Sequence, residues 1–541
     1  MTRPNTPENA GVLTPDENAY SSDRTQDEFS KAEIERLGRQ RPEVLSSTIV
    51  EFGFVTAIIM SMMMGEFFVS GFNIVLPTVA RSLDIPDSSR TWPAEVPSLT
   101  TAAFLLPCAR LSDRYGGRIV FLFGVSWLVV WSLICGFSQN TNMLIVCRAM
   151  QGVSTASYLP AGMSLLGQTY RPGPRKNFIF SLYGAFTVLG FYIGIAVGAL
   201  MAQLLDWRWY FWVGALLALA NAVIGYLTVP KLAGQGGDAA LVMDWWGLGT
   251  IVPGIVLIIF AFTSGSGAPE GWSTPYVYVT LIVGVLFLAA AVYVEGLGGR
   301  AAPVSGRGLP TQGHEAACRF PVFLETVLHT TPLQTAAWFT PMALGGIFLA
   351  LVGGVVLHLI PGRILMLVSG LGFLLSMLLV ALIPEQDSAT GTPSNSFIYW
   401  AYIFSAMLCA TIGVDITFNV TNVFITTSMP ARLQATAGAL INTLLYLGIA
   451  FWLGVAELAV SQAKEARERE GGDSLSPREQ YKIAFWLGVA LAAVTLILFS
   501  TLKVGQASAD MTADEKAQLA EELAARQAAA QAEENGERVE K

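Results

Sequence analysis

The chain has 541 residues, of which 53% are hydrophobic and 13% are charged, and its formal net charge is −8. Soluble domains carry about 25% charged residues. The charged residues gather in two tails (1–44 and 504–541) and one loop (463–482), so that only 34 of them are spread over the other 439 residues. This distribution excludes a water-facing surface along most of the chain, and we expect the body of the protein to lie in lipid. The acidic balance comes from the C-terminal tail and indicates no nucleic-acid partner.

The N-terminal tail is polar. Residues 1–28 predict disorder, and residues 29–41 predict a short charged helix at the membrane surface. The tail contains no basic segment followed by an apolar one, as a cleaved signal peptide requires. The first apolar span is therefore expected to act as the targeting signal.

Thirteen apolar segments follow, and each predicts a transmembrane helix, because a bilayer core requires about 20 predominantly apolar residues per helix. The predicted spans are residues 54–76, 96–111, 119–137, 143–166, 178–205, 209–229, 245–263, 277–294, 337–357, 364–383, 399–424, 437–460 and 483–502.

A polar connector, residues 299–336, interrupts this series. Lys and Arg concentrate in cytoplasmic loops, and the first five basic loops are separated by two spans each, whereas one span lies between Arg307 and Arg363. A degenerate fourteenth crossing near residues 318–333 would restore the alternation and place both termini in the cytosol. That stretch contains Glu325 and His329, and a surface or re-entrant segment is the alternative.

The segment between the second and third predicted spans carries an ordered D-R-x-G-x-R pattern at residues 113–118. Asp113 can form an ion pair with a facing helix end or with Arg114 and Arg118, which gives a helix pair two discrete arrangements. We expect these three residues to form a gating loop. An ordinary positively charged cytosolic loop would explain the arginines but not the order of the pattern.

The fourth and fifth predicted spans carry two further signals. Arg148 lies inside the fourth span, and a charge at bilayer depth is costly and by default functional. It is therefore a candidate for proton coupling, with a structural ion pair as the alternative. Gly190, Gly194 and Gly198 fall four residues apart on one face of the fifth span, which predicts close helix packing.

Polar residues recur inside an apolar run of the second half. Asp415, Asn419 and Asn422 follow the i, i+4, i+7 spacing of one helix face, and Asn442 lies in the next span. A buried acid must find a partner or take up a proton. Asp415 is thus a second candidate for proton coupling, and structural hydrogen bonding between helices is the alternative.

These patterns resemble the major facilitator superfamily. Residues 109–118 are similar to its G-x-L-A-D-R-x-G-R-R loop, and residues 148–152 to its R-x-x-Q-G motif, in which the arginine is associated with proton coupling. Residues 190–199 are similar to its antiporter motif, with Ile195 in place of the proline. Residues 70–77 resemble the first-span element of fourteen-span drug/proton antiporters, with Glu66 as the nearby carboxylate in place of the usual acid.

The resemblance extends further along the chain. Residues 207–211 match the W-R-W-x-F element of the same antiporters. Residues 171–177, 332–341 and 438–443 resemble the fungal branch that includes aminotriazole-resistance exporters and low-affinity ammonium transporters.

The resemblance implies an all-α integral membrane protein of the major facilitator fold. It divides the chain into segments, which are a cytosolic tail (1–50), an N-terminal six-helix bundle (51–230), an inserted helix pair (231–298), the connector (299–336), a C-terminal bundle (337–503) and a cytosolic acidic tail (504–541). Substrates of such folds bind near the midplane between the bundles.

The function that the resemblance implies is proton-driven export of small organic compounds by a non-enzymatic, monomeric transporter at the fungal plasma membrane. Its partners would be a small-molecule substrate, protons and the bilayer. Uptake of ammonium or another small cation is one alternative, and a non-transporting nutrient sensor is another. Glu66, Arg148 and Asp415 would carry protons or form ion pairs, and the candidate substrate contacts are polar: Asn73, Gln151, Asn419, Asn422 and Asn442.

No cofactor, metal or ATP is expected. The sequence has no phosphate-binding loop, zinc-protease or paired C-x-x-C motif, and its three histidines predict no metal site. The five cysteines lack metal or disulfide spacing, and four of them lie in apolar runs where small buried hydrophobic side chains are expected. They are Cys108, Cys135, Cys147, Cys318 and Cys409.

Overall fold

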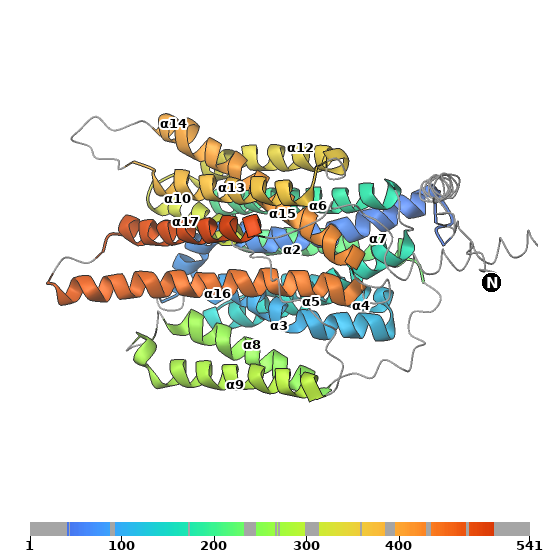
Figure 1. The fold of residues 1–541 in the computed structure, drawn as a ribbon, viewed down its shortest axis with the longest axis horizontal. Coiled ribbons are helices and arrows are strands. Elements are labelled where there is room, and N and C mark those ends of the chain that lie inside the picture. Colours follow the sequence, from blue (N-terminus) through green and yellow to red (C-terminus); the bar gives the residue numbers. More distant parts are fainter. Residues whose placement is uncertain are drawn as a thin grey trace, which may run out of the picture.

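A computed structural model of the chain describes the backbone of residues 40–42, 44–86, 92–170, 174–231, 245–265, 268, 271–297, 313–356, 360–384, 395–428, 434–471 and 475–501. Helices are the only extended regular elements of these residues, and most run nearly parallel to one long axis (Figure 1). The helices are α2 (Thr48–Ser82), α3 (Trp92–Tyr115), α4 (Gly117–Cys135), α5 (Thr141–Thr169), α6 (Pro174–Leu204), α7 (Arg208–Thr228), α8 (Trp245–Gly265), η2 (Gly271–Ser273), α9 (Pro275–Leu297), α10 (Gly313–Thr326), α11 (Pro332–Trp338), α12 (Thr340–Val356), α13 (Gly362–Ala381), α14 (Asn395–Ile398), the π-helical turn η3 (Tyr399–Ile403), α15 (Phe404–Ser428), α16 (Gln434–Arg469) and α17 (Pro477–Thr501).

The predicted all-α fold class is confirmed, and each of the thirteen predicted spans overlaps a helix over most of its length. Polar side chains begin several helices at the expected places. Ser47 accepts a hydrogen bond from the backbone N–H of Val50 at 3.2 Å, and Asn140 accepts one from the N–H of Met143 at 2.8 Å. These caps satisfy N–H groups that have no partner within the helix.

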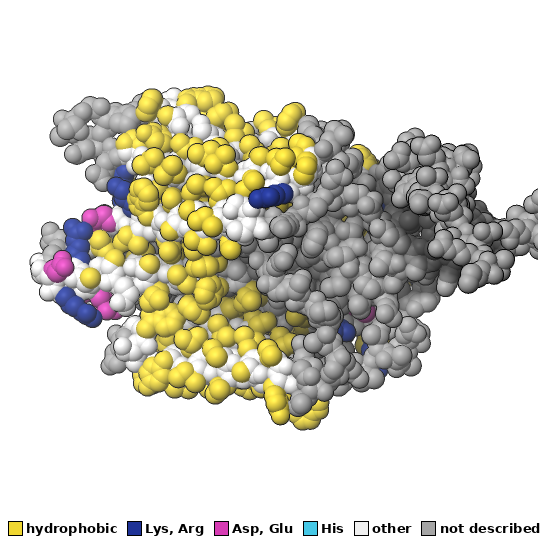
Figure 2. Space-filling model, viewed as in Figure 1, with side chains coloured by type: hydrophobic (Ala, Val, Ile, Leu, Met, Phe, Trp, Pro, Cys, Tyr) yellow, Lys and Arg dark blue, Asp and Glu magenta, His cyan; other side chains and the backbone are white. Residues whose placement is uncertain are grey.

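The exposed surfaces of the helices are apolar, as contact with lipid requires. Eight of the described helical segments are long and apolar enough to cross a membrane, on α2, α4, α6, α7, α9, α13, α14–α15 and α17. Large hydrophobic side chains such as Ile119, Phe123 and Val130 of α4 are at least half exposed. Figure 2 shows hydrophobic side chains over much of the described surface of one face, with the largest group of charged side chains at its left end. An apolar exterior of this extent is stable against hydrocarbon and not against water.

Helix α10 lies where a degenerate fourteenth crossing is predicted. Its 14 residues span about 21 Å, which is shorter than a hydrocarbon core of about 30 Å. The helix contains Pro321 and is followed by His329, whose φ of 51° is left-handed. Residues 298–312 of the connector lie outside the described residues, and the total number of crossings and the exact domain boundaries stay predictions.

The helices pack in two sets. We call the end of the molecule at which α2 begins the proximal end, and the end at which α2 finishes the distal end. Helices α2 to α7 pack mainly against one another and form the first set. The second set comprises α12, α13, α15, α16 and α17, in which α15 contacts α12, α13 and α16, and α17 contacts α13 and α16. The sets meet along two seams, α3 with α16 and α6 with α11 and α12. The pair α8 and α9 lies beside the first seam, because α8 contacts both α3 and α16 (Figure 1).

A hydrophobic cluster joins the two sets across the second seam. It combines Val188 and Phe191 of α6 with side chains of α10, α11 and α17, among them Phe320, Phe323 and Phe485. Two polar contacts accompany it. The Tyr192 hydroxyl lies 3.1 Å from that of Thr340, and the backbone N–H of Leu333 donates to Gln203 at 3.1 Å. The short helix α10 therefore contributes apolar packing between the two sets.

The contact between α2 and α6 is closely fitted. A Cβ atom added to Gly194 would lie 2.6 Å from the carbonyl oxygen of Phe67, and one added to Gly190 would lie 2.7 Å from Cα of Met63. Gly198 meets the backbone of Gly71 in the same way. The structure thus places the three glycines along this helix contact, where their lack of a side chain lets the backbones approach.

Substitution of Gly194 by alanine is expected to lower the free energy of unfolding by about 1–3 kcal/mol, because the new methyl group meets α2 backbone that has no room to move. Thermal unfolding of the purified protein in detergent measures the change. Gly249→Ala on α8 is the matched control, since a Cβ there meets nothing within 4 Å. Equal midpoints for the two variants would contradict the expectation.

Candidate functional site

Glu66 lies in the middle of α2, and its side chain is buried. Three tyrosines from three other helices surround this point, Tyr158 of α5, Tyr183 of α6 and Tyr446 of α16. Tyr158 and Tyr183 lie close enough to Glu66 to interact with its charge. A Cβ on the neighbouring Gly65 would lie 3.4 Å from the Tyr158 hydroxyl and 3.9 Å from that of Tyr446. We call these three residues the tyrosine cluster, and it brings both helix sets to one carboxylate.

Asn419 of α15 meets α6 from the other set, because a Cβ on Gly184 would lie 2.8 Å from Oδ1 of Asn419. Asp415 lies beside α12, since a Cβ on Gly346 would lie 3.3 Å from its Oδ2 and 2.7 Å from Cγ1 of Val188. Gly184 follows Tyr183 directly, so α6 connects Asn419 to the tyrosine cluster.

The structure places the other polar candidate residues of the second half as follows. Asn442 is buried on α16, one helical turn before Tyr446, so the two share a face. The side chain of Asn422 lies outside the described residues. Glu66, Asn419 and Asn442 thus approach one region between the sets, and Asp415 lies one turn from Asn419 along α15.

Arg148 belongs to a different network, inside the first helix set. The side chain is fully buried on α5, and its partners are neutral. Nε donates to the carbonyl of Pro93 at 3.0 Å, Nη1 donates to Oε1 of Gln151 at 3.0 Å, and the guanidinium lies 4.3 Å from the centre of the Phe72 ring. Gln151 in turn donates to Ser132 of α4 at 2.9 Å. A cation buried in this way is held by hydrogen bonds and by the ring face.

Two predicted substrate contacts are therefore used within the first set. Gln151 is buried between Arg148 and Ser132 and does not join the tyrosine cluster. Asn73 donates to the carbonyl of Val69 on its own helix at 2.9 Å. Sequence spacing assigns each residue to a helix, but it does not fix the rotation of that helix about its axis. It therefore does not tell which neighbouring helix the residue faces.

The three residues of the predicted gating loop lie at the ends of two helices, which only one residue separates. Asp113 and Arg114 lie in the last turn of α3, Arg118 lies in the first turn of α4, and Gly116 separates the helices with a φ of 94°. A left-handed conformation of this kind favours glycine. Arg118 Nη2 donates to the carbonyl of Tyr226 at the end of α7, at 3.1 Å. The loop thus connects α3, α4 and α7 at the proximal end.

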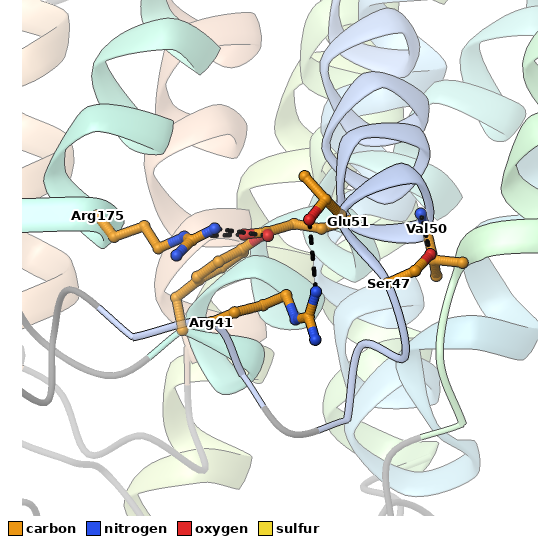
Figure 3. A network of polar contacts seen from close by, with 7 residues as sticks. Arg41, Ser47, Val50, Glu51 and Arg175 are labelled. Carbon is orange, nitrogen blue, oxygen red and sulfur yellow. Dashed lines mark hydrogen bonds and ion pairs between the residues drawn. The ribbon is translucent and has the colours of Figure 1, made fainter.

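A second proximal network was not predicted from the sequence (Figure 3). Glu51, in the first turn of α2, is buried and accepts hydrogen bonds from Arg175 of α6, from Nε at 2.9 Å and from Nη2 at 2.6 Å. Tyr170, which ends α5, donates its hydroxyl to the same carboxylate at 3.0 Å. Burial and the Glu51 charge raise the pKa of Tyr170, so the phenol stays a donor at neutral pH. Figure 3 also shows Arg41 beside this site, where it donates to Thr48 at 3.4 Å.

The Glu51 network joins the ends of three helices, and one signal in the sequence marks it. Glu51 is an acid at the very start of the first apolar span, and Arg175 lies in the basic segment before the fifth span. Opposite charges at the same predicted membrane face suggest a pair, but several arginines share that face.

Arg175→Gln is expected to lower the free energy of unfolding by about 1–3 kcal/mol, because it leaves the buried Glu51 carboxylate with too few donors. The double variant with Glu51→Gln should recover part of the loss. Unfolding midpoints of the single and double variants measure the coupling. Lys231→Gln, which removes an exposed proximal charge, is the control. A double variant no more stable than Arg175→Gln would contradict the pairing.

Comparison with known proteins identifies relatives over most of the chain. A family model described as Major Facilitator Superfamily matches residues 55–453. A low affinity ammonium transporter of Saccharomyces cerevisiae is 30% identical over 76% of this chain and 80% of its own length. An efflux pump of Aspergillus terreus is 27% identical over 78% of this chain and 82% of its own. The aminotriazole resistance protein of S. cerevisiae is 24% identical over 78% and 80%.

The fold has a solved counterpart as well. The crystal structure of a human organic anion transporter superposes with a TM-score of 0.52 at 13% identity, covering 83% of this chain and 99% of that one. At this identity the likeness concerns the fold alone.

Proposed function

The chain belongs to the major facilitator superfamily and is a multi-pass membrane transporter, and from this premise we propose that it exports small organic compounds in exchange for protons. One observation carries the proposal. A buried carboxylate, Glu66, lies near the tyrosine cluster, whose members come from helices of both sets. In folds of this kind substrates bind near the midplane between the two bundles, and access alternates as the bundles rock.

The chemistry of this point suits exchange. An isolated carboxylate is costly in a low-dielectric interior, and either a bound proton or a positively charged group on a substrate can neutralise it. The phenol hydroxyls of the tyrosine cluster can donate to the carboxylate when the proton has left. Because one group serves both ligands, binding of a proton at Glu66 would favour release of the substrate.

Asp415 and Arg148 take supporting parts in the proposal. Asp415 is buried on α15 beside Gly346 of α12, and it is a second carboxylate that can hold a proton. Arg148 is a fixed positive charge held by neutral partners within the first set, and it stays a candidate for proton coupling. Asn419 and Asn442 would offer hydrogen bonds to the substrate.

Uptake of a small cation is the second candidate function. It is favoured by the relative named as a low affinity ammonium transporter, which is 30% identical. A buried carboxylate with aromatic neighbours also suits a small cation, since ring faces attract positive charge. Export is the primary proposal because relatives named as efflux pumps and multidrug transporters match similar shares of the chain.

We further propose that the proximal end faces the cytosol, that both termini lie there, and that the protein acts as a monomer in the plasma membrane. The support for this orientation is charge. Basic side chains near the proximal end include Arg114, Arg118 and Arg175, and cytoplasmic loops concentrate Lys and Arg.

The experiment is solute flux in vesicles that contain the purified protein under an imposed pH gradient. Aminotriazole is the organic probe and methylammonium the cation probe. Export by exchange predicts that aminotriazole moves against the direction of proton flow, and that collapse of the gradient stops it. Methylammonium uptake without aminotriazole export would support the second function, and no flux of either would support a sensor.

Glu66→Gln is expected to leave the protein folded but to reduce gradient-driven flux to below about a tenth of the wild-type rate, because the amide cannot bind and release a proton. Flux in vesicles measures the effect, and a size-exclusion profile reports folding. Asp206→Asn is the matched control, since Asp206 is exposed and pairs with Arg208 at the distal end. Wild-type flux in Glu66→Gln would remove Glu66 from the coupling mechanism.

Asp415→Asn is expected to insert and fold normally and to lose gradient-driven flux. The amide keeps the size of the side chain at its contact with α12 and removes the titratable group. If this variant transports at the full rate, Asp415 has no part in coupling.

A further inference from the structure

Two buried thiols lie near the distal end of the first helix set, on the neighbouring helices α4 and α5. Cys135 is the last residue of α4, and Cys147 lies in the second turn of α5. Their side chains are 0% and 1% exposed. Both are free thiols in this structure. Their spacing in the sequence does not indicate a disulfide bond. The antiparallel packing of α4 and α5 brings the two cysteines together.

The pair follows the antiparallel register of the α4–α5 contact. Deeper in the same contact, Gln151 donates to Ser132 at 2.9 Å. Further along, a Cβ on Gly124 would lie 2.9 Å from both Cβ of Ser157 and the backbone N of Tyr158. A close approach of the two helices is therefore continuous along this contact. A disulfide requires Cα atoms about 4.4–6.8 Å apart, which is the range that closely packed helices provide.

We propose that Cys135 and Cys147 form a reversible disulfide bond that joins α4 to α5. The transport function proposed above does not depend on this bond. It would lie next to Arg148, which follows Cys147 directly, and would fix the start of α5 against α4 on the side where the arginine is held. The oxidised protein would then keep the Arg148 network in one arrangement.

Hydrogen peroxide is the oxidant that the proposal requires. The thiolate of one cysteine attacks a peroxide oxygen, the O–O bond breaks, and a sulfenic acid forms with loss of hydroxide, which takes up a proton to become water. The second thiol attacks the sulfenic sulfur, its proton leaves with the departing hydroxide as a second water, and the S–S bond forms. The cysteines lose two electrons and two protons, and peroxide is reduced to two water molecules. A dithiol reductant reverses the bond by thiol–disulfide exchange.

The test uses the full-length protein in membranes, exposed to hydrogen peroxide or left untreated. Remaining thiols are blocked with a maleimide after denaturation, and the linked peptides are mapped by mass spectrometry. Peroxide should produce a Cys135–Cys147 linked peptide and lower the number of maleimide-reactive thiols by two per chain, and dithiothreitol should restore both. Blocked Cys135 and Cys147 after peroxide, or a link from either to another cysteine, would overturn the proposal.

Two controls keep the result specific. Cys108→Ser removes a thiol that lies 3.5 Å from the Ser157 hydroxyl in another helix contact, and it should leave the linked peptide unchanged. The double variant Cys135→Ala, Cys147→Ala should lose it.

A second measurement compares each protein with and without peroxide. It therefore does not require the double variant to be as stable as the wild-type protein. Peroxide should raise the unfolding midpoint of the wild-type protein, because a cross-link restricts the unfolded chain, and should leave that of the double variant unchanged. An equal change in both proteins would contradict a Cys135–Cys147 bond.

Discussion

The close approach of α2 and α6 is the constraint on which the candidate site depends. Glycines on both helices bring their backbones together, and the Ser70 hydroxyl crosses the contact to donate to the carbonyl of Phe191 at 2.7 Å. This contact fixes Glu66 and Tyr183 on facing helices. It also holds the start of α2 beside the start of α6, where Glu51 and Arg175 meet. A polar group in lipid needs its partner within reach, so the positions of Glu51, Glu66 and Arg175 follow from this packing contact.

Much of the fold could be predicted from the sequence, because lipid imposes a simple rule on composition. Residues that face hydrocarbon must be apolar and helical over about 20 positions, and by this rule each of the thirteen predicted spans overlaps a helix over most of its length. Helix α10 marks the limit of the rule. Pro321 and Glu325 weaken its apolar pattern, and α10 is too short to cross alone while it packs between the two helix sets.

The site was less accessible to sequence reasoning, for a different physical reason. Spacing along a helix assigns residues to a common face but does not tell which neighbour that face meets. Gln151 shares its helix with Tyr158, yet it bonds to Arg148 and Ser132 while Tyr158 lies near Glu66. The tyrosine cluster is assembled from helices that include distant parts of the sequence, so no local sequence motif predicts it. Cys135 and Cys147 were read as small hydrophobic residues, and their proximity follows only from the register of α4 and α5.

The position of α8 makes the two seams between the helix sets unequal. Phe262 of α8 packs on Phe451 of α16 with ring centres 4.9 Å apart, and Phe260 packs on Trp92 of α3 at 5.5 Å. An acyl chain of the bilayer cannot occupy the groove between α3 and α16 where these rings already lie. A lipophilic molecule that dissolves first in the membrane would thus meet a covered groove along one seam and a differently built surface along the other.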